Sequence, residues 1–244
     1  MNDEDIDLAL MTGVDIPLPE YGLILHQPTV KEISMIGEHT FYVGAQCLTI
    51  NKNMYIEDES LLSAMSNFQI FMTIMTNKDE QGKEKKAAIR AVLSILFPNA
   101  SVMTTPRSLL FKFEESSAMI DEENFEDLQK ILSRVFCLQA AGEDNFNPAN
   151  AAAKKIAEKL MRGRQRVAAQ HASEAGSVLT QYVSALTVGL HSMSLQNLIN
   201  LTIFQLYDLI ERYNLYLNWD IDIRSRLAGA KGEKPVENWM KNIH

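Results

Sequence analysis

Apolar residues recur every three or four positions along most of the chain, which is the spacing of helices that bury one face. In the clearest case Phe68, Met72 and Met75 fall on one side of a helix. A basic helix is predicted after the cap-and-proline pair Asn147-Pro148. Apart from that helix, which extends to about residue 170, the pattern predicts helices over 58–76, 84–97, 177–190 and 195 to about 218.

Strand-like segments are short and lie in the N-terminal half. Residues 21–26 are rich in β-formers, and residues 101–113 contain two apolar runs around a Thr-Pro-Arg-Ser turn, which predicts a hairpin. Residues 38–51 fit either a strand or a helix. The predicted fold is therefore mainly α with a small β component (α+β): a multi-helix globular protein with a short hairpin or small sheet in its N-terminal half.

Several helix ends are marked by local signals. Thr29 is expected to cap a short helix that stops at Gly37, and Asp121 is expected to cap the helix that follows it. Ser194 is expected to cap the last long helix. That helix carries two apolar stripes, which predicts packing on two sides.

The stretch after this helix, residues 220–232, contains alternating charges and a Gly-Ala-Lys-Gly sequence. A phosphate-binding loop is disfavoured, because Gly232 stands where a Ser or Thr would hold magnesium. Asp220 to Arg226 fits either a short strand or an ion-pair turn, with at least one intramolecular ion pair. We expect Gly229 or Gly232 to end the helix and Trp239 to pack back onto the C-terminal helices, with a docking surface as the alternative.

Three regions are distinguished along the chain. Residues 1–20 carry six acidic and no basic residues and predict an acidic N-terminal arm, either disordered or ordered on a partner. Residues 21–145 form an N-terminal α+β region, and residues 147–244 form a C-terminal helical region with a folded tail. The best internal boundary is 142–147, and whether the two regions share one core stays open.

Composition narrows the function classes. The net charge of −8 disfavours nucleic acid as a partner, and two cysteines in apolar surroundings fit a reducing compartment. Neither a signal peptide nor an apolar run long enough to span a membrane is recognised. The sequence predicts a soluble, cytoplasmic protein that does not bind membranes.

No set of residues predicts catalysis. The five histidines lack metal-ligand spacing, and the carboxylates of residues 121–127 fit the solvated first turn of a helix. A Cys–His pair brought together by the fold stays open, but nothing favours it. We therefore expect no catalytic residue, cofactor or metal, and no enzyme.

Protein partners are the better expectation. Methionine side chains adapt to varied surfaces, although core packing is the default interpretation. The basic helix fits a solvated face, a contact with an acidic protein (the chain's own arm or a neighbouring copy's) or, least well, nucleic acid. The candidate partner-binding residues are Met65, Met72, Met75, Lys154, Lys155, Arg162, Arg164, Arg166 and Trp239.

Four segments of the chain have a distinctive sequence: PTVKEISMIG (28–37), IDEENFEDLQKIL (120–132), NPANAAAKKIAEKL (147–160) and NLTIFQLYDLIERYNLYLNWDIDIRSRLAGAKG (200–232). The last is the most specific, because Gln-Leu-Tyr-Asp, Asp-Ile-Arg-Ser, Leu-Ala-Gly-Ala and a late Trp follow in order. These segments resemble a group of bacteriophage proteins encoded in the tail modules of phages and prophages of Gram-positive bacteria. The resemblance spans most of residues 21–240.

This resemblance implies a non-enzymatic role in virion morphogenesis, similar to that of tail assembly chaperones. Such a chaperone keeps the tape measure protein soluble in the host cytoplasm and recruits tail tube subunits. The alternative is a structural virion protein of the tail or connector, and a homo-oligomer stays open. The group contributes no catalytic residues.

Overall fold

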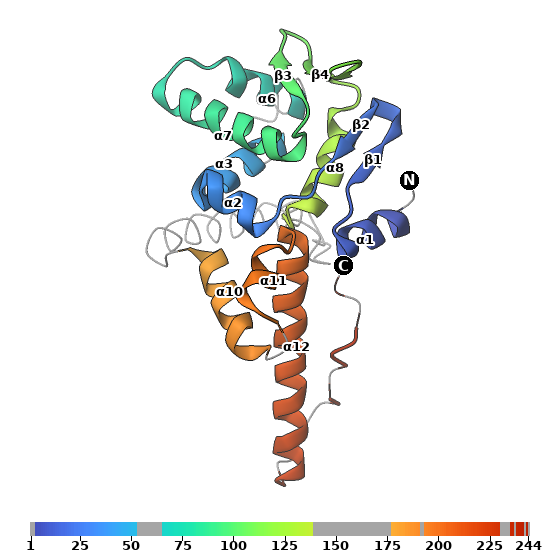
Figure 1. Ribbon diagram of the computed structural model, residues 1–244, viewed down its shortest axis with the longest axis vertical. Coiled ribbons are helices and arrows are strands. Elements are labelled where there is room, and N and C mark those ends of the chain that lie inside the picture. Colours follow the sequence, from blue (N-terminus) through green and yellow to red (C-terminus); the bar gives the residue numbers. More distant parts are fainter. Residues whose placement is uncertain are drawn as a thin grey trace, which may run out of the picture.

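The chain is mainly helical and carries two small antiparallel sheets, one of two strands and one of three (Figure 1). The fold class predicted from the sequence is confirmed. This computed structural model describes residues 3–52, 65–138, 177–190, 193–229, 235–236, 238–241 and 243.

The acidic N-terminal segment folds against its own chain. Its helix α1 buries Ile6, Ala9 and Leu10, and the chain then forms a two-stranded sheet. A disordered arm, or one that orders only on a partner, is therefore wrong for residues 3–20, because the apolar side chains are covered within the molecule. The elements are α1 (Asp3–Thr12), β1 (Ile16–Leu18), the 3-10 turn η1 (Pro19–Tyr21) and β2 (Leu23–Leu25).

Two helices follow the first sheet. α2 (Val30–Ile36) is capped by Thr29 and ends at Gly37, as predicted. The ambiguous segment after it is a helix, α3 (Glu38–Leu48), and not a strand. A Cβ atom on Gly44 would lie only 2.5 Å from the Ala88 carbonyl oxygen. The glycine thus lets α3 approach the following helix hairpin closely.

The next helices form that hairpin, α6 (Asn67–Thr76) and α7 (Glu80–Leu96). Ser66 caps α6, while residues 53–64 of the predicted helix over 58–76 lie outside the described part of the chain. α7 begins four residues earlier than predicted, because the Asp79 side chain accepts a hydrogen bond from the Gly82 amide. The predicted pair of helices is thus confirmed within the described residues, with shifted ends.

The predicted hairpin is confirmed, but a third strand extends it. All three strands are antiparallel in the order β3-β4-β5, and α8 follows. Asp121 does not cap α8. Its side chain accepts from the Glu123 amide in the preceding turn, and Asn124 takes the cap position. The elements are β3 (Ser101–Thr104), β4 (Leu109–Lys112), β5 (Ser117–Ile120) and α8 (Phe125–Val135).

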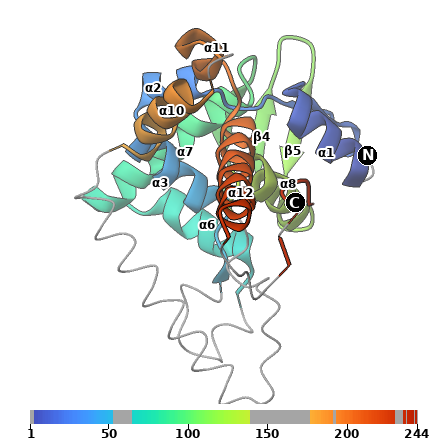
Figure 2. The ribbon, with the colours of Figure 1, turned by 90° about the horizontal axis from the view of Figure 1, so that it is seen from below.

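The C-terminal region contains α10, α11 and α12. The single helix predicted from Ser194 is wrong: Ser194 caps only the five-residue α11, and Thr202 caps a new helix, α12, that runs beyond residue 218. Viewed from below, α12 lies centrally, with α10 on one side and α1 on the other (Figure 2). The elements are α10 (Val178–Gly189), α11 (Leu195–Ile199) and α12 (Ile203–Leu227).

Nearly all buried apolar side chains between Ile6 and Leu206 form one continuous cluster in the described residues. Phenylalanine pairs connect its elements: the ring centroids of Phe71 and Phe125 are 5.0 Å apart, which joins α6 to α8. Aromatic pairs add to the free energy that burial provides. The predicted boundary at 142–147 lies outside the described residues, but the parts on either side of it contribute to this cluster.

The N-termini of α2 and α12 are joined by an antiparallel bridge between their capping residues, Thr29 and Thr202. The Val30 amide donates to the Leu201 carbonyl (3.0 Å), and the Ile203 amide donates to the carbonyl of residue 28 (2.8 Å). The first amides of a helix have no partner within it. Each helix therefore satisfies the first amide of the other.

The third residue of each helix reaches from this bridge toward the N-terminal segment. Gln205 Nε2 donates to the Met11 carbonyl (2.9 Å). Glu32 Oε1 lies 3.1 Å from His26 Nε2, and His26 Nδ1 lies 2.8 Å from Asp15 Oδ1. The two capping boxes thus hold the end of α1 and the turn that follows it.

Further polar contacts fix α1. The buried Gln27 donates through Nε2 to the Ala9 carbonyl (2.7 Å). Arg134 of α8 forms ion pairs with Asp3 and Asp7. Two of the acidic residues of α1 are thus paired with an arginine of the same chain.

The bridge between the two helix caps predicts energetic coupling. Thr202→Ala removes the oxygen that accepts from the Gln205 amide (3.2 Å), and Thr29→Ala removes its counterpart. Each change should lower the free energy of unfolding by about 1 kcal/mol. Because the two caps share one bridge, the double variant should lose less than the sum. Urea denaturation followed by circular dichroism measures this; Ser66→Ala, at the distant cap of α6, should add fully to Thr29→Ala.

The contacts of His26 predict a pH dependence. Burial lowers its pKa, but hydrogen bonds to Asp15 and Glu32 raise it more, so the net pKa lies above the ordinary 6.5. A raised folded pKa gives stability that is complete below about pH 6.5 and is lost as the pH rises through the folded pKa. Burial raises the pKa of Glu32, but hydrogen bonds from Thr29 and His26 lower it below 4.5, so its contribution is lost in acid.

His26→Gln should therefore cost most between about pH 5 and 6.5, by about 1 kcal/mol, and progressively less toward pH 9. Urea midpoints of both proteins across this range provide the measurement. A cost that stays constant over the whole range would contradict the proposed titration.

Candidate protein-binding surfaces

The methionines proposed for partner binding are largely covered. Met72 and Met75 of α6 are buried, and Met65, just before the helix, is half-buried against the core. Phe68 of the same helix packs edge-on against Phe125 of α8, with ring centroids 5.2 Å apart. Core packing thus accounts for Met65 and Met75, while Met72 also lines a surface groove. Partner binding through these methionines stays a prediction.

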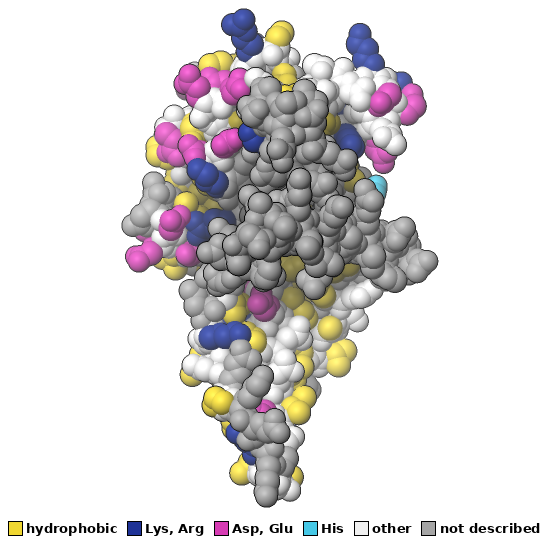
Figure 3. Space-filling model, turned by 180° about the vertical axis from the view of Figure 1, so that it is seen from behind, with side chains coloured by type: hydrophobic (Ala, Val, Ile, Leu, Met, Phe, Trp, Pro, Cys, Tyr) yellow, Lys and Arg dark blue, Asp and Glu magenta, His cyan; other side chains and the backbone are white. Residues whose placement is uncertain are grey.

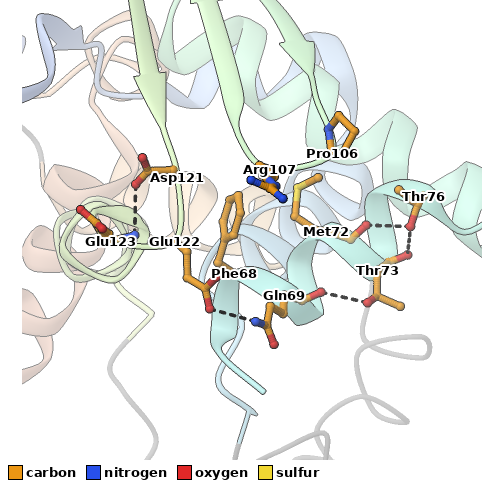
Figure 4. Close-up of a pocket in the computed structure, with 10 residues that line it drawn as sticks. All are labelled: Phe68, Gln69, Met72, Thr73, Thr76, Pro106, Arg107, Asp121, Glu122 and Glu123. Atoms are coloured by element: carbon orange, nitrogen blue, oxygen red, sulfur yellow. Dashed lines mark hydrogen bonds between the residues drawn. The ribbon is translucent and has the colours of Figure 1, made fainter. Parts of the chain in front are cut away.

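This groove lies beside α6, where three parts of the chain meet (Figure 4). Its volume is about 870 Å³. α6 forms the floor, the turn between β3 and β4 forms one wall, and the loop between β5 and α8 forms the other. The lining residues are Phe68, Gln69, Met72, Thr73 and Thr76 on the floor, Pro106 and Arg107 on one wall, and Asp121, Glu122 and Glu123 on the other.

Part of this lining is fixed by hydrogen bonds within the groove. Gln69 Nε2 donates to Glu122 Oε1 across it (3.0 Å). The hydroxyls of Thr73 and Thr76 donate to carbonyls of their own helix, both at 2.9 Å. The hydroxyl protons of both threonines are therefore already used within the helix.

The proposed basic surface lies outside the described residues. No position is given for the five side chains that define it, so their role stays a prediction. These residues are Lys154, Lys155, Arg162, Arg164 and Arg166.

α12 leaves the body of the molecule for much of its length (Figure 1). Its first turns are buried, but Tyr216, Ile221 and Leu227 are 42%, 60% and 82% exposed. The expected packing on two sides is thus right for the first half of the helix and wrong for the second. Figure 3 shows hydrophobic side chains along this projecting part, hereafter the distal half of α12 (residues 213–227).

The charges near the end of α12 are paired along the helix. Arg224 Nε lies 2.9 Å from Asp220 Oδ2, and Arg226 Nε lies 2.9 Å from Asp222 Oδ1. The predicted intramolecular ion pair is confirmed. The expected strand or turn is wrong, because charges spaced by four residues face each other on a helix.

The tail returns along α12. The ring of Trp239 lies 5.6 Å from that of Tyr216 and 6.5 Å from that of Trp219. Arg212 Nη1 donates to the carbonyls of Trp239 (3.0 Å) and Lys241 (2.7 Å). The predicted packing of Trp239 onto the C-terminal helices is confirmed.

Gly229 ends α12. Its φ of +96° lies in the left-handed region, and its amide donates to the Arg226 carbonyl (3.0 Å). Glycine adopts this conformation without strain, which explains the helix end predicted at this position. Residues 230–234, including Gly232, lie outside the described part of the chain.

The described residues show little reactive chemistry. They contain no group of three or more His, Cys, Asp and Glu side chains that could hold a metal ion. Burial raises the pKa of Cys47, and burial together with Asp208 and Glu211 raises that of Cys137 to about 12. Both thiols are therefore protonated at neutral pH and are weak nucleophiles.

One row of side chains on the three-stranded sheet was not recognised from the sequence. Met103, Leu110 and Met119 lie opposite one another across the three strands, and both methionines are exposed. The third strand was not predicted, so the row could not be recognised. The alternation of Ser117 to Ile120 was the available signal.

The comparisons with known proteins concern the C-terminal part. Residues 171–244 match a family model described as the YomV second domain. The match indicates a phage-related protein. It covers less than half of the chain and includes α10, α11, α12 and the tail. Searches of curated proteins and of solved structures found no match. In the described residues no helix is both long and apolar enough to cross a membrane.

Trp239→Ala should release the tail without unfolding the body. The indole packs against Tyr216 and Trp219 in the distal half of α12, away from the buried core, so the free energy of global unfolding should change by less than about 1.5 kcal/mol. Trypsin should cleave the tail several times faster, as followed by mass spectrometry. Met240→Ala is the matched control, since that side chain is exposed. Equal cleavage rates for both variants would contradict the packing role of Trp239.

Proposed function

We propose that this phage-related protein is a non-enzymatic tail morphogenesis protein that acts in the host cytoplasm as a tail assembly chaperone or adaptor. Its proposed partners are the tape measure and tail tube proteins. Two overlapping lines support the proposal: the family match of residues 171–244 supports a phage-related protein, and the resemblance of residues 21–240 to tail-module proteins supports the tail role. Both include α12.

The observation that carries the proposal is the distal half of α12. A chaperone must present apolar surface to its client and still remain folded. Buried residues such as Phe204 and Leu206 anchor the start of this helix, while Tyr216 and Leu227 stay exposed near its end. Exposed apolar surface of this kind is typical of interaction sites.

The spacing of these side chains fits a helical client. Tyr216, Ile223 and Leu227 are seven and four residues apart, which places them on one face of α12. A partner helix can pack along such a stripe with its own apolar residues. The resemblance assigns the chaperone group a long, apolar-patterned tape measure protein as client, and this stripe suits that pattern.

Co-expression with the tape measure protein of the same phage tests the proposal. The wild type should raise the soluble yield of that protein and co-purify with it. Ile223→Asp together with Leu227→Asp should reduce the yield several-fold, because both side chains lie on this stripe. Met35→Asp, at an exposed position on α2, should behave as wild type. No solubilisation and no co-purification would sink the proposal.

Mass spectrometry of purified particles separates a chaperone from a structural tail or connector subunit. The chaperone should be absent from finished particles, or present only in traces. Many copies in each particle would establish the virion role in its place.

A further inference from the structure

The groove beside α6 combines opposite charges on facing walls. Arg107, on the turn between β3 and β4, is exposed, and its guanidinium forms no hydrogen bond or ion pair with the described residues. Across the groove, the backbone amide of the exposed Glu123 donates to Asp121 Oδ1 (3.1 Å), and its carboxylate forms no hydrogen bond or ion pair with the part of the chain that the structure describes. Both charged groups are therefore available to a ligand.

The position of the acidic wall at the start of α8 is itself favourable. Asp121, Glu122 and Glu123 precede α8, and no side chain caps the first amides of this helix. The positive end of the helix dipole favours carboxylates at this position. That effect explains the acidic wall alone, but it does not explain the arginine opposite or the space between them.

The space between the walls suits protein side chains. Phe68 and Met72 form an apolar base; in Figure 4 Phe68 lies between Arg107 and the acidic loop, and Met72 lies beside Arg107 on the side away from that loop. The lining carries three carboxylates and one guanidinium, so the groove is acidic overall and is unsuited to nucleic acid. An apolar side chain flanked by a basic residue matches this arrangement.

We propose that the groove binds an amphipathic helical segment of a partner protein that carries Lys or Arg next to an apolar anchor. The anchor contacts Phe68 and Met72, and the basic side chain pairs with Glu123. The positive N-terminal end of the bound helix lies toward the acidic wall and its negative C-terminal end toward Arg107. The inference deepens the proposed function, on which it rests, by assigning a second client-binding surface apart from α12.

Synthetic peptides test the chemistry directly. A labelled 18-residue Leu/Lys amphipathic peptide is titrated with the full chain, and a Leu/Glu peptide of the same pattern serves as the control probe. Fluorescence anisotropy should show binding of the Lys peptide only, weakened by added salt. Equal binding of both peptides would overturn the proposal.

Two groove variants locate the site. Glu123→Lys should lower the affinity for the Lys peptide roughly three- to tenfold, because an attraction between opposite charges becomes a repulsion between like charges. Thr73→Arg should abolish binding by filling the floor at an exposed position. Glu115→Lys is the matched control, since Glu115 is exposed in the turn at the opposite end of the sheet. Unchanged affinity in both groove variants, with native circular dichroism spectra, would refute the site.

The tape measure protein separates this inference from the proposed function. If it co-purifies equally with wild type and Thr73→Arg but is lost in the α12 variant, the groove is not a client site and the chaperone role stands. If it binds no form of the protein while the Lys peptide still binds the groove, the chaperone role fails and the groove remains a protein-binding site.

Discussion

The fold depends on the exchange of hydrogen bonds between the first turns of α2 and α12. The first amide of each helix has no acceptor within that helix. The Val30 amide of α2 donates to the Leu201 carbonyl, directly before the cap of α12, and the Ile203 amide of α12 donates to the carbonyl of residue 28, directly before the cap of α2. Burying two helix ends together would be costly without this exchange. Because it is made, residues 28–36 and 201–227 have a fixed relative position, and the side chains of Glu32 and Gln205 can reach the N-terminal segment.

This junction also explains why α12 is buried at one end and exposed at the other. The helix is held where Thr202 meets Thr29, and its first residues fill the common core. Beyond these turns, among the described residues, the tail around Trp239 lies alongside it. The ion pairs from Asp220 and Asp222 to arginines one turn later support a helix that has few tertiary contacts there. Exposure of apolar surface and retention of helical form are thus compatible.

Helix ends that depend on a few neighbouring residues were predicted from local signals in the sequence. The Thr29 cap, the Gly37 stop and the Gly229 end each need only a few neighbouring residues, and all three were found. Ser194 and Thr202 carry equivalent cap signals. A new helix begins after Thr202 because the Leu201 carbonyl accepts a hydrogen bond from α2, which is distant in the sequence. The spacing of apolar residues within one segment does not report a hydrogen bond to a distant segment, so the break between α11 and α12 could not be predicted.

The groove was beyond the sequence for a related reason. Met72, Arg107 and Glu123 come from three separate elements, and each has an ordinary local interpretation as core, turn or helix start. Only the packing of α6 against α8 through Phe68 and Phe125 brings them together. In contrast, the distal half of α12 keeps its apolar pattern in one continuous segment. The spacing of apolar residues along this helix could be recognised up to about residue 218, although it was interpreted as a packed face and not as an exposed one. A surface assembled from three elements becomes visible only once the core that joins them is known.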